Sequence, residues 1–213
     1  MDLIFQIRYS RNRVESRFCA LDDAAYVTPA AGGREICATF GIRFYAWSAV
    51  CFAEESLCDS MHVVCNPHRY FHRVCAELES RLFDTSSLAE RILLAEGVLL
   101  RALQPERQRP EVLNALYVMA TGRGALRAED VAGAACVSVR QLQRLFREQT
   151  GAPPKLLAQL IRCQRIYREL AEQRFAPREA VGRYGSADQS HLIRDFRRFH
   201  GLTPTEAVRM MRS

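Results

Sequence analysis

The chain has 213 residues, of which 48% are hydrophobic, and 30 basic against 24 acidic side chains give a formal net charge of +6. This length can bury the cores of two small domains or one large one. No run approaches the roughly 18 apolar residues of a membrane span, and the N-terminus lacks the layout of a signal peptide. We therefore expect a soluble, cytoplasmic protein whose eight cysteines are reduced thiols.

The N-terminal part is predicted to contain short antiparallel strands followed by helices. Segments rich in β-branched and aromatic residues, typical of strands, occupy residues 2–9, 14–21, 24–28 and 34–45. Asn66 and Pro67 start a predicted helix that runs to about Leu82. Ser87 and Glu90 form a capping box for another, through about Leu103. We expect a sensor or dimerisation domain over residues 1–103 and a polar, proline-containing linker at 104–110.

One group of side chains in this part could carry chemistry. Seven thiols and imidazoles fall within 25 residues: Cys51, Cys58, His62, Cys65, His68, His72 and Cys75. On helices, Cys58/His62/Cys65 and His68/His72/Cys75 would each share one face, and such ligands suit zinc or copper, or a redox sensor. The favoured interpretation is ordinary packing, because Cys75 continues an apolar stripe and the chain holds no C-x-x-C pair. A metal at Cys58, His62 and Cys65 stays the alternative, and no cofactor is otherwise expected.

The C-terminal part contains two short segments that are each followed by a basic amphipathic helix. In residues 127–136, Ala132 and Ala135 allow close helix packing, and Ser138 is a good N-cap for the next helix. Within residues 138–150, Leu142, Leu145 and Phe146 form an apolar stripe. The opposite face repeats at helical spacing with Arg140, Gln143, Arg144 and Arg147. Arginine and glutamine are the side chains that pair with base edges in a major groove.

The same arrangement occurs again after a long helix predicted at residues 155–170. Residues 177–184 form a predicted short helix, Gly185 a turn, and Asp188 the N-cap of a helix through His200. Its inward residues are Leu192, Phe196 and Phe199, and its outward residues are Ser190, His191, Arg194, Arg197 and Arg198. A short helix, a tight turn and a basic helix make a helix-turn-helix, and the sequence predicts it twice.

The run GSADQSHLIRDFRRFHGLTP at residues 185–204 resembles the signature of AraC-type transcriptional regulators, usually G-[aromatic]-x-D-Q-S-H-F-x-R-x-F-[KR]-x-x-x-G-x-[TS]-P. The run SVRQLQRLFREQTGAPP at residues 138–154 resembles the family's first helix-turn-helix. The likeness covers residues 111–213. It implies an all-α domain of two helix-turn-helix subdomains joined by a linker helix, so the whole chain would be α+β. Residues 1–103 resemble only weakly the small β-rich domains that precede some such domains, and no enclosed ligand barrel is expected.

The resemblance implies that both basic helices contact double-stranded DNA. The residues that the resemblance implies as DNA contacts are Arg140, Gln143, Arg144 and Arg147 in the first helix, and Gln189, Ser190, His191, Arg194 and Arg198 in the second. Ser186 and Leu192 depart from the family pattern, as does Val181, and Gly182 costs about 1 kcal/mol inside a helix. We therefore expect the second helix to contribute phosphate contacts more than base discrimination.

Charge supports this division of the chain. Residues 111–213 hold 17 basic and 10 acidic side chains, a net of +7, whereas residues 1–110 hold 13 and 14, a net of −1. The positive charge lies entirely in the half expected to neutralise phosphates. We expect a sequence-specific transcriptional regulator whose partners are DNA, RNA polymerase and an undetermined effector, with no membrane partner. Homodimerisation is a further expected role of the N-terminal domain.

This function has two alternatives. A regulator that senses metal or redox state through the N-terminal thiols and imidazoles is one alternative. An architectural DNA-binding protein without a sensor is another. An enzyme is not expected, because the chain has no G-x-S-x-G, Walker loop or H-E-x-x-H. The spacing of Cys58, Cys65 and Cys75 also does not suit the zinc–cysteine domain of a DNA-repair methyltransferase.

Overall fold

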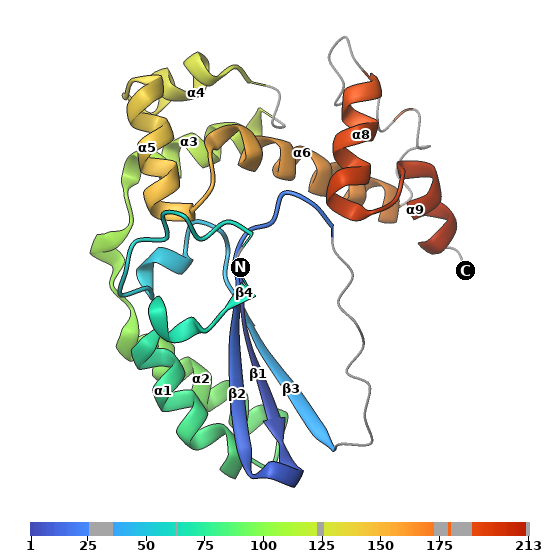
Figure 1. The fold of residues 1–213 in the computed structure, drawn as a ribbon. Helices are drawn as coiled ribbons and strands as arrows, with labels where there is room; N and C mark the ends of the chain where they lie inside the picture. The colour runs from blue at the N-terminus through green and yellow to red at the C-terminus, as the bar shows by residue number, and fades with distance from the viewer. Residues whose placement is uncertain (26–35, 63, 123–125, 173–178, 180–188, 212–213) are drawn as a thin grey trace. The chain divides into compact units, whose positions relative to one another are not determined.

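The computed structural model describes residues 1–25, 36–62, 64–122, 126–172, 179 and 189–211 (Figure 1). The chain divides into two compact units, which are described separately. The first unit comprises Met1–Leu21, Pro29–Pro110 and Leu145–Ala152. The second comprises Asp22–Thr28, Glu111–Arg144 and Pro153–Ser213. No described helix is long and apolar enough to cross a membrane.

The first unit is built on an open antiparallel sheet of the order β3-β1-β2-β4. Its strands are β1 (Asp2–Arg8), β2 (Arg13–Cys19), β3 (Cys37–Arg43) and β4 (Val64–Cys65). In β1, burial alternates with the period of two that a one-sided sheet requires, and Leu3, Phe5 and Ile7 are completely buried. Phe5 lies opposite Ser16 of β2 and Phe40 of β3, which fixes the register.

Two helices pack with the buried face of this sheet (Figure 1). They are α1 (His72–Arg81) and α2 (Leu88–Ala102). The described residues of this unit also form five single 3-10 turns: η1 (Tyr9–Arg11), η2 (Ala49–Cys51), η3 (Pro67–Arg69), η4 (Leu82–Asp84) and η5 (Pro105–Arg107). The Ser87 hydroxyl accepts from the Glu90 N–H at 3.2 Å, which confirms Ser87 as the N-cap of α2. The Glu90 carboxylate accepts instead from the N–H of Ser86 at 2.8 Å.

Two predicted elements of the first half differ in the structure. The strand expected at residues 24–28 is absent from Ala24 and Ala25, and the remainder of that segment lies outside the described residues. The helix expected from Pro67 to Leu82 is interrupted, because Phe71 has a non-helical backbone (φ −134, ψ 43). This break lets Tyr70 and Phe71 both turn into the core, where they are 1% and 0% exposed.

The second unit is helical. Its described helices are α3 (Pro110–Thr121), α4 (Ala128–Ala134), the N-terminal half of α5 (Val139–Thr150), α6 (Pro154–Ala171), α8 (Gln189–His200) and α9 (Pro204–Met211). One core of this unit joins three helices through Cys163, Ile166 and Leu170 of α6, Phe196 of α8 and Ala207 of α9. The long helix predicted at residues 155–170 is therefore present as α6. Leu157, Cys163 and Leu170 of this helix are buried, while Tyr167 is 40% exposed.

Candidate nucleic-acid interface

The first basic helix is preceded by a short helix and a tight turn, as predicted. Ala132 and Ala135, at the end of α4, are 2% and 3% exposed. The turn is made by Cys136, whose φ of 56° lies in the left-handed region. The Ser138 hydroxyl then accepts from the N–H of Gln141 at 3.2 Å, and the Gln141 side chain accepts from the N–H of Ser138 at 3.0 Å. This reciprocal pair caps the start of α5.

Helix α5 separates its side chains into an apolar face and a basic face. Leu142, Leu145 and Phe146 are 1%, 7% and 0% exposed, as the apolar stripe predicted. The four proposed DNA-contact residues of this helix are all exposed: Arg140, Gln143, Arg144 and Arg147. Three guanidinium groups and one carboxamide thus share one solvent-facing side, a combination that suits phosphates and base edges.

Helix α8 also presents polar and basic side chains to solvent. Phe196 is completely buried, whereas Ser190, His191 and Arg194 are exposed. Arg198 is exposed as well, but its guanidinium is paired with the carboxylate of Asp23 in the same unit. No sequence pattern indicates this ion pair, because Asp23 and Arg198 are far apart in the chain.

The inner side of α8 is held on α6 by polar contacts. Asp195 accepts hydrogen bonds from Gln159 at 3.0 Å and from Arg162 at 3.3 Å. At the end of α8, the ring of His200 stacks on Tyr167 with centroids 5.0 Å apart. Burial of this imidazole lowers its pKa, because desolvation disfavours the charged form. These contacts fix which side of α8 faces solvent.

Part of the second predicted helix-turn-helix lies outside the described residues. This applies to the short helix at 177–184, to Val181, Gly182, Gly185 and Ser186, and to the expected N-cap Asp188. It applies also to the side chains of Gln189 and Leu192. The expected asymmetry between the two basic helices therefore stays a prediction.

The N-terminal thiols and imidazoles do not share the helical faces considered for them. Cys58 and His62 lie in turns and Cys65 lies in β4, so no helix aligns the three side chains. His68 lies in η3, and its Nδ1 is 3.2 Å from Nδ1 of His72 at the start of α1. The other ring nitrogen of His68 is 2.9 Å from the Glu79 carboxylate. Cys75 faces the core and is 0% exposed, as the packing interpretation predicted.

Three thiols of this part are less acidic than an ordinary cysteine. Burial raises the pKa of Cys51, of Cys65 and, most strongly, of Cys75. Desolvation destabilises a thiolate, which is the form that binds metal or reacts with oxidants. In the second unit, burial raises the pKa of Cys163 to about 12.

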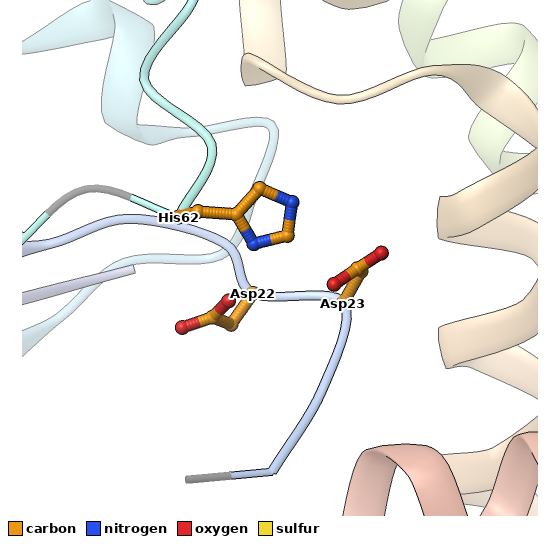
Figure 2. Close-up of side chains that lie close together, drawn as sticks. All are labelled: Asp22, Asp23 and His62. Atoms are coloured by element: carbon orange, nitrogen blue, oxygen red, sulfur yellow. The ribbon is translucent and has the colours of Figure 1, made fainter.

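Figure 2 shows three side chains of the kind that bind metals: Asp22, Asp23 and His62. Asp22 and Asp23 are counted with the second unit and His62 with the first. We therefore assign no site to this group.

The short helix α4, its left-handed turn and the basic helix α5 define a helix-turn-helix, the structural class in which a second helix reads duplex DNA. Residues 131–210 match the family model described as a helix-turn-helix domain. This segment is a DNA-binding domain of the AraC type, and the protein is a DNA-binding transcription regulator. No curated protein and no solved structure matches the chain.

Proposed function

We propose that the protein is a sequence-specific transcription regulator that reads two successive major-groove segments of duplex DNA with α5 and α8. Such segments face the same side of the duplex about one turn, roughly 34 Å, apart. The observation that carries the proposal is the exposed row of Arg140, Gln143, Arg144 and Arg147 on a capped, well-packed helix. A rigid helix is what base reading requires, because paired hydrogen bonds tolerate little displacement.

The two helices are proposed to contribute differently. The carboxamide of Gln143 suits the paired hydrogen bond to adenine, and Arg144 the one to guanine. Helix α8 offers Arg194 and, when it is released from Asp23, Arg198, which suit phosphates. Gln189, Ser190 and His191 complete its proposed contact set. Arg194→Ala is then expected to lower affinity for all duplexes, whereas Gln143→Ala lowers it for the preferred one.

The N-terminal domain, proposed as residues 1–103 with a linker at 104–110, would sense a signal, dimerise or do both, and RNA polymerase would be the partner at the promoter. Metal or redox sensing at Cys58, His62 and Cys65 gains no support, because these side chains share no helical face and the Cys65 thiol has a raised pKa.

Selection of bound duplexes from a random pool, followed by measurements on the full chain, tests the proposal. Gln143→Ala should reduce the free energy of binding to the selected duplex by about 1–3 kcal/mol. The loss on a random duplex should be much smaller, because a carboxamide carries no charge toward phosphates. Gln164→Ala, the same change at an exposed position of α6, is the control. Equal losses on both duplexes would show that α5 does not read sequence.

A further inference from the structure

The C-terminal end of α5 is part of the first unit, although its N-terminal end belongs to the second. The boundary lies between Arg144 and Leu145, in the middle of the basic helix. Beyond the boundary the helix ends in two buried polar residues, Gln149 (8% exposed) and Thr150 (0%). Buried polar side chains are retained where they have specific partners, so the partners of Gln149 indicate what this end of the helix is fitted to.

Gln149 binds the backbone of the segment that precedes α3. Its Oε1 accepts from the N–H of Arg109 at 3.1 Å, and its Nε2 donates to the carbonyl of Arg107 at 3.0 Å. One carboxamide thus satisfies a donor and an acceptor two residues apart, as the backbone of a neighbouring strand would. Two simultaneous hydrogen bonds define an orientation, which a single bond or an apolar contact does not.

The segment that Gln149 binds is itself fixed on the first unit. The Gln108 side chain donates to the carbonyl of Trp47 at 3.0 Å. The Arg107 guanidinium donates to the carbonyl of Ala53 and, at 3.3 Å, to that of Glu55. The N–H of Gln104 donates to the carbonyl of Cys51 at 2.8 Å. Residues 104–109 therefore form a fixed support between α5 and the turns around residues 47–55.

A second contact holds the same end of α5. The N–H of Leu57 donates to the carbonyl of Glu148 at 3.3 Å. Gly151, which ends the helix with a φ of 72°, fits so closely that an added Cβ would lie 2.8 Å from the carbonyl oxygen of Leu57 and would overlap Ser60 Oγ. Ser60 is itself completely buried. Only glycine allows both this backbone conformation and this approach.

We infer that Gln149 is a positioning residue for DNA recognition, through which the first unit sets the orientation of α5. Gln149 lies six residues from Gln143, which is about 9 Å along the helix. Because α5 is one continuous helix, a rotation or shift at Gln149 displaces Gln143, Arg144 and Arg147 relative to the groove. The inference rests on the proposed function, and it adds that base discrimination by α5 depends on Arg107–Arg109 and the Leu57–Ser60 turn.

The test compares full-length variants at position 149. Gln149→Met keeps the length of the side chain and removes both hydrogen bonds. We expect it to lower the affinity ratio between the selected and the random duplex by about tenfold. Affinity for the random duplex should change less than about twofold, because no charge is altered. Gln164→Ala, exposed on α6, should leave both affinities unchanged.

Gln149→Glu distinguishes a positioning role from a merely structural one, because only the positioning role predicts that discrimination between duplexes changes with pH. An ionised glutamate accepts from Arg109 but has no proton for the carbonyl of Arg107, whereas a protonated one restores both hydrogen bonds. For Gln149→Glu we measure the ratio of its affinity for the selected duplex to its affinity for the random duplex, and divide it by the same ratio for the unmodified protein at each pH. This quotient should rise as the pH falls from about 8 to about 5.5. This comparison also serves if Gln149→Met does not fold.

The outcomes separate this inference from the proposed function. If the unmodified protein prefers the selected duplex and Gln149→Met keeps the full preference, the positioning role is wrong while the proposed function stands. The same conclusion follows if Gln149→Glu discriminates equally at both pH values. If the unmodified protein shows no sequence preference, the proposed function fails, and the positioning role fails with it.

Discussion

The carboxylate of Asp23 is paired with the guanidinium of Arg198, one of the side chains expected to contact DNA. The pairing is supported by the backbone, because the N–H of Ala25 donates to the carbonyl of Arg198 at 2.7 Å. Asp23 and Arg198 are both counted with the second unit. A carboxylate thus occupies a guanidinium that would otherwise be available to a phosphate, which lowers the positive charge that α8 offers to DNA.

Removal of this carboxylate should strengthen DNA binding. We expect Asp23→Asn to raise affinity for any duplex by about three- to tenfold at low salt, because Arg198 becomes available for a phosphate. The slope of log affinity against log salt should steepen by about one. Asp22→Asn, the same charge change one residue earlier, is the control. Equal effects of the two variants would mean that net charge, not release of Arg198, is responsible.

The apolar and capping patterns of the basic helices could be predicted from sequence. Leu142, Leu145 and Phe146 are buried as their helical spacing indicated, and Ser138 caps α5. Local signals suffice there because the relevant partners lie three or four residues away. The strands β1, β2 and β3 could also be predicted, because their segments are rich in the β-branched and aromatic residues typical of strands.

What could not be predicted depends on contacts between residues distant in the chain. The carboxylate of Glu54 accepts a hydrogen bond from the N–H of Arg73 at 2.7 Å near the start of α1. No pattern in the sequence around either residue indicates this contact. Gln149 continues a polar run, and only its partners Arg107 and Arg109 distinguish it from a solvent-facing glutamine. Asp23 was likewise without a sequence signal. These are tertiary hydrogen bonds and ion pairs, which have no periodicity.

Cys136 is expected to stabilise its turn less than glycine would. A side chain at a φ of 56° costs about 1–2 kcal/mol relative to glycine, although glycine loses more conformational entropy on folding. Cys136→Gly should therefore raise the free energy of unfolding by about 0.5–1 kcal/mol, and Cys136→Val should lower it. Urea unfolding of the two variants measures both changes. A destabilised glycine variant would mean that the Cys136 thiol contributes more than its backbone costs.

The thiols should label in the order of their exposure and acidity. Cys37 and Cys136 are exposed and should react first with an alkylating reagent at neutral pH. Cys75 and Cys163 should react only on unfolding, because both are buried and their pKa values are raised. Mass spectrometry of timed samples gives the order.

The same thiols should not control DNA binding. Cys58→Ser and Cys65→Ser should leave the affinity for the selected duplex unchanged, and oxidants should have no effect at these positions. Zinc or copper retained in stoichiometric amount by untagged protein, together with loss of binding in Cys65→Ser, would instead favour the metal-sensing alternative.

His200 should make the second unit less stable in acid. Burial holds its pKa below the ordinary value of 6.5, so the unfolded chain takes up the proton at a higher pH than the folded one. The stabilising contribution is intact above about pH 6.5 and is lost as the pH falls below it, until the folded imidazole is also protonated. His200→Phe keeps a ring beside Tyr167 and Phe196 but cannot ionise.

At neutral pH the free energy of unfolding of His200→Phe should be about 1 kcal/mol lower than that of the unmodified protein, because the imidazole hydrogen-bonds to the backbone of Cys163. As the pH falls, the free energy of unfolding of this variant should decrease less than that of the unmodified protein. Urea unfolding followed by circular dichroism, between about pH 8 and pH 5, measures the difference. His191→Phe, at an exposed position of the same helix, should keep the pH dependence of the unmodified protein. If His200→Phe and the unmodified protein lose stability in parallel, the acid-sensitive group lies elsewhere in the chain.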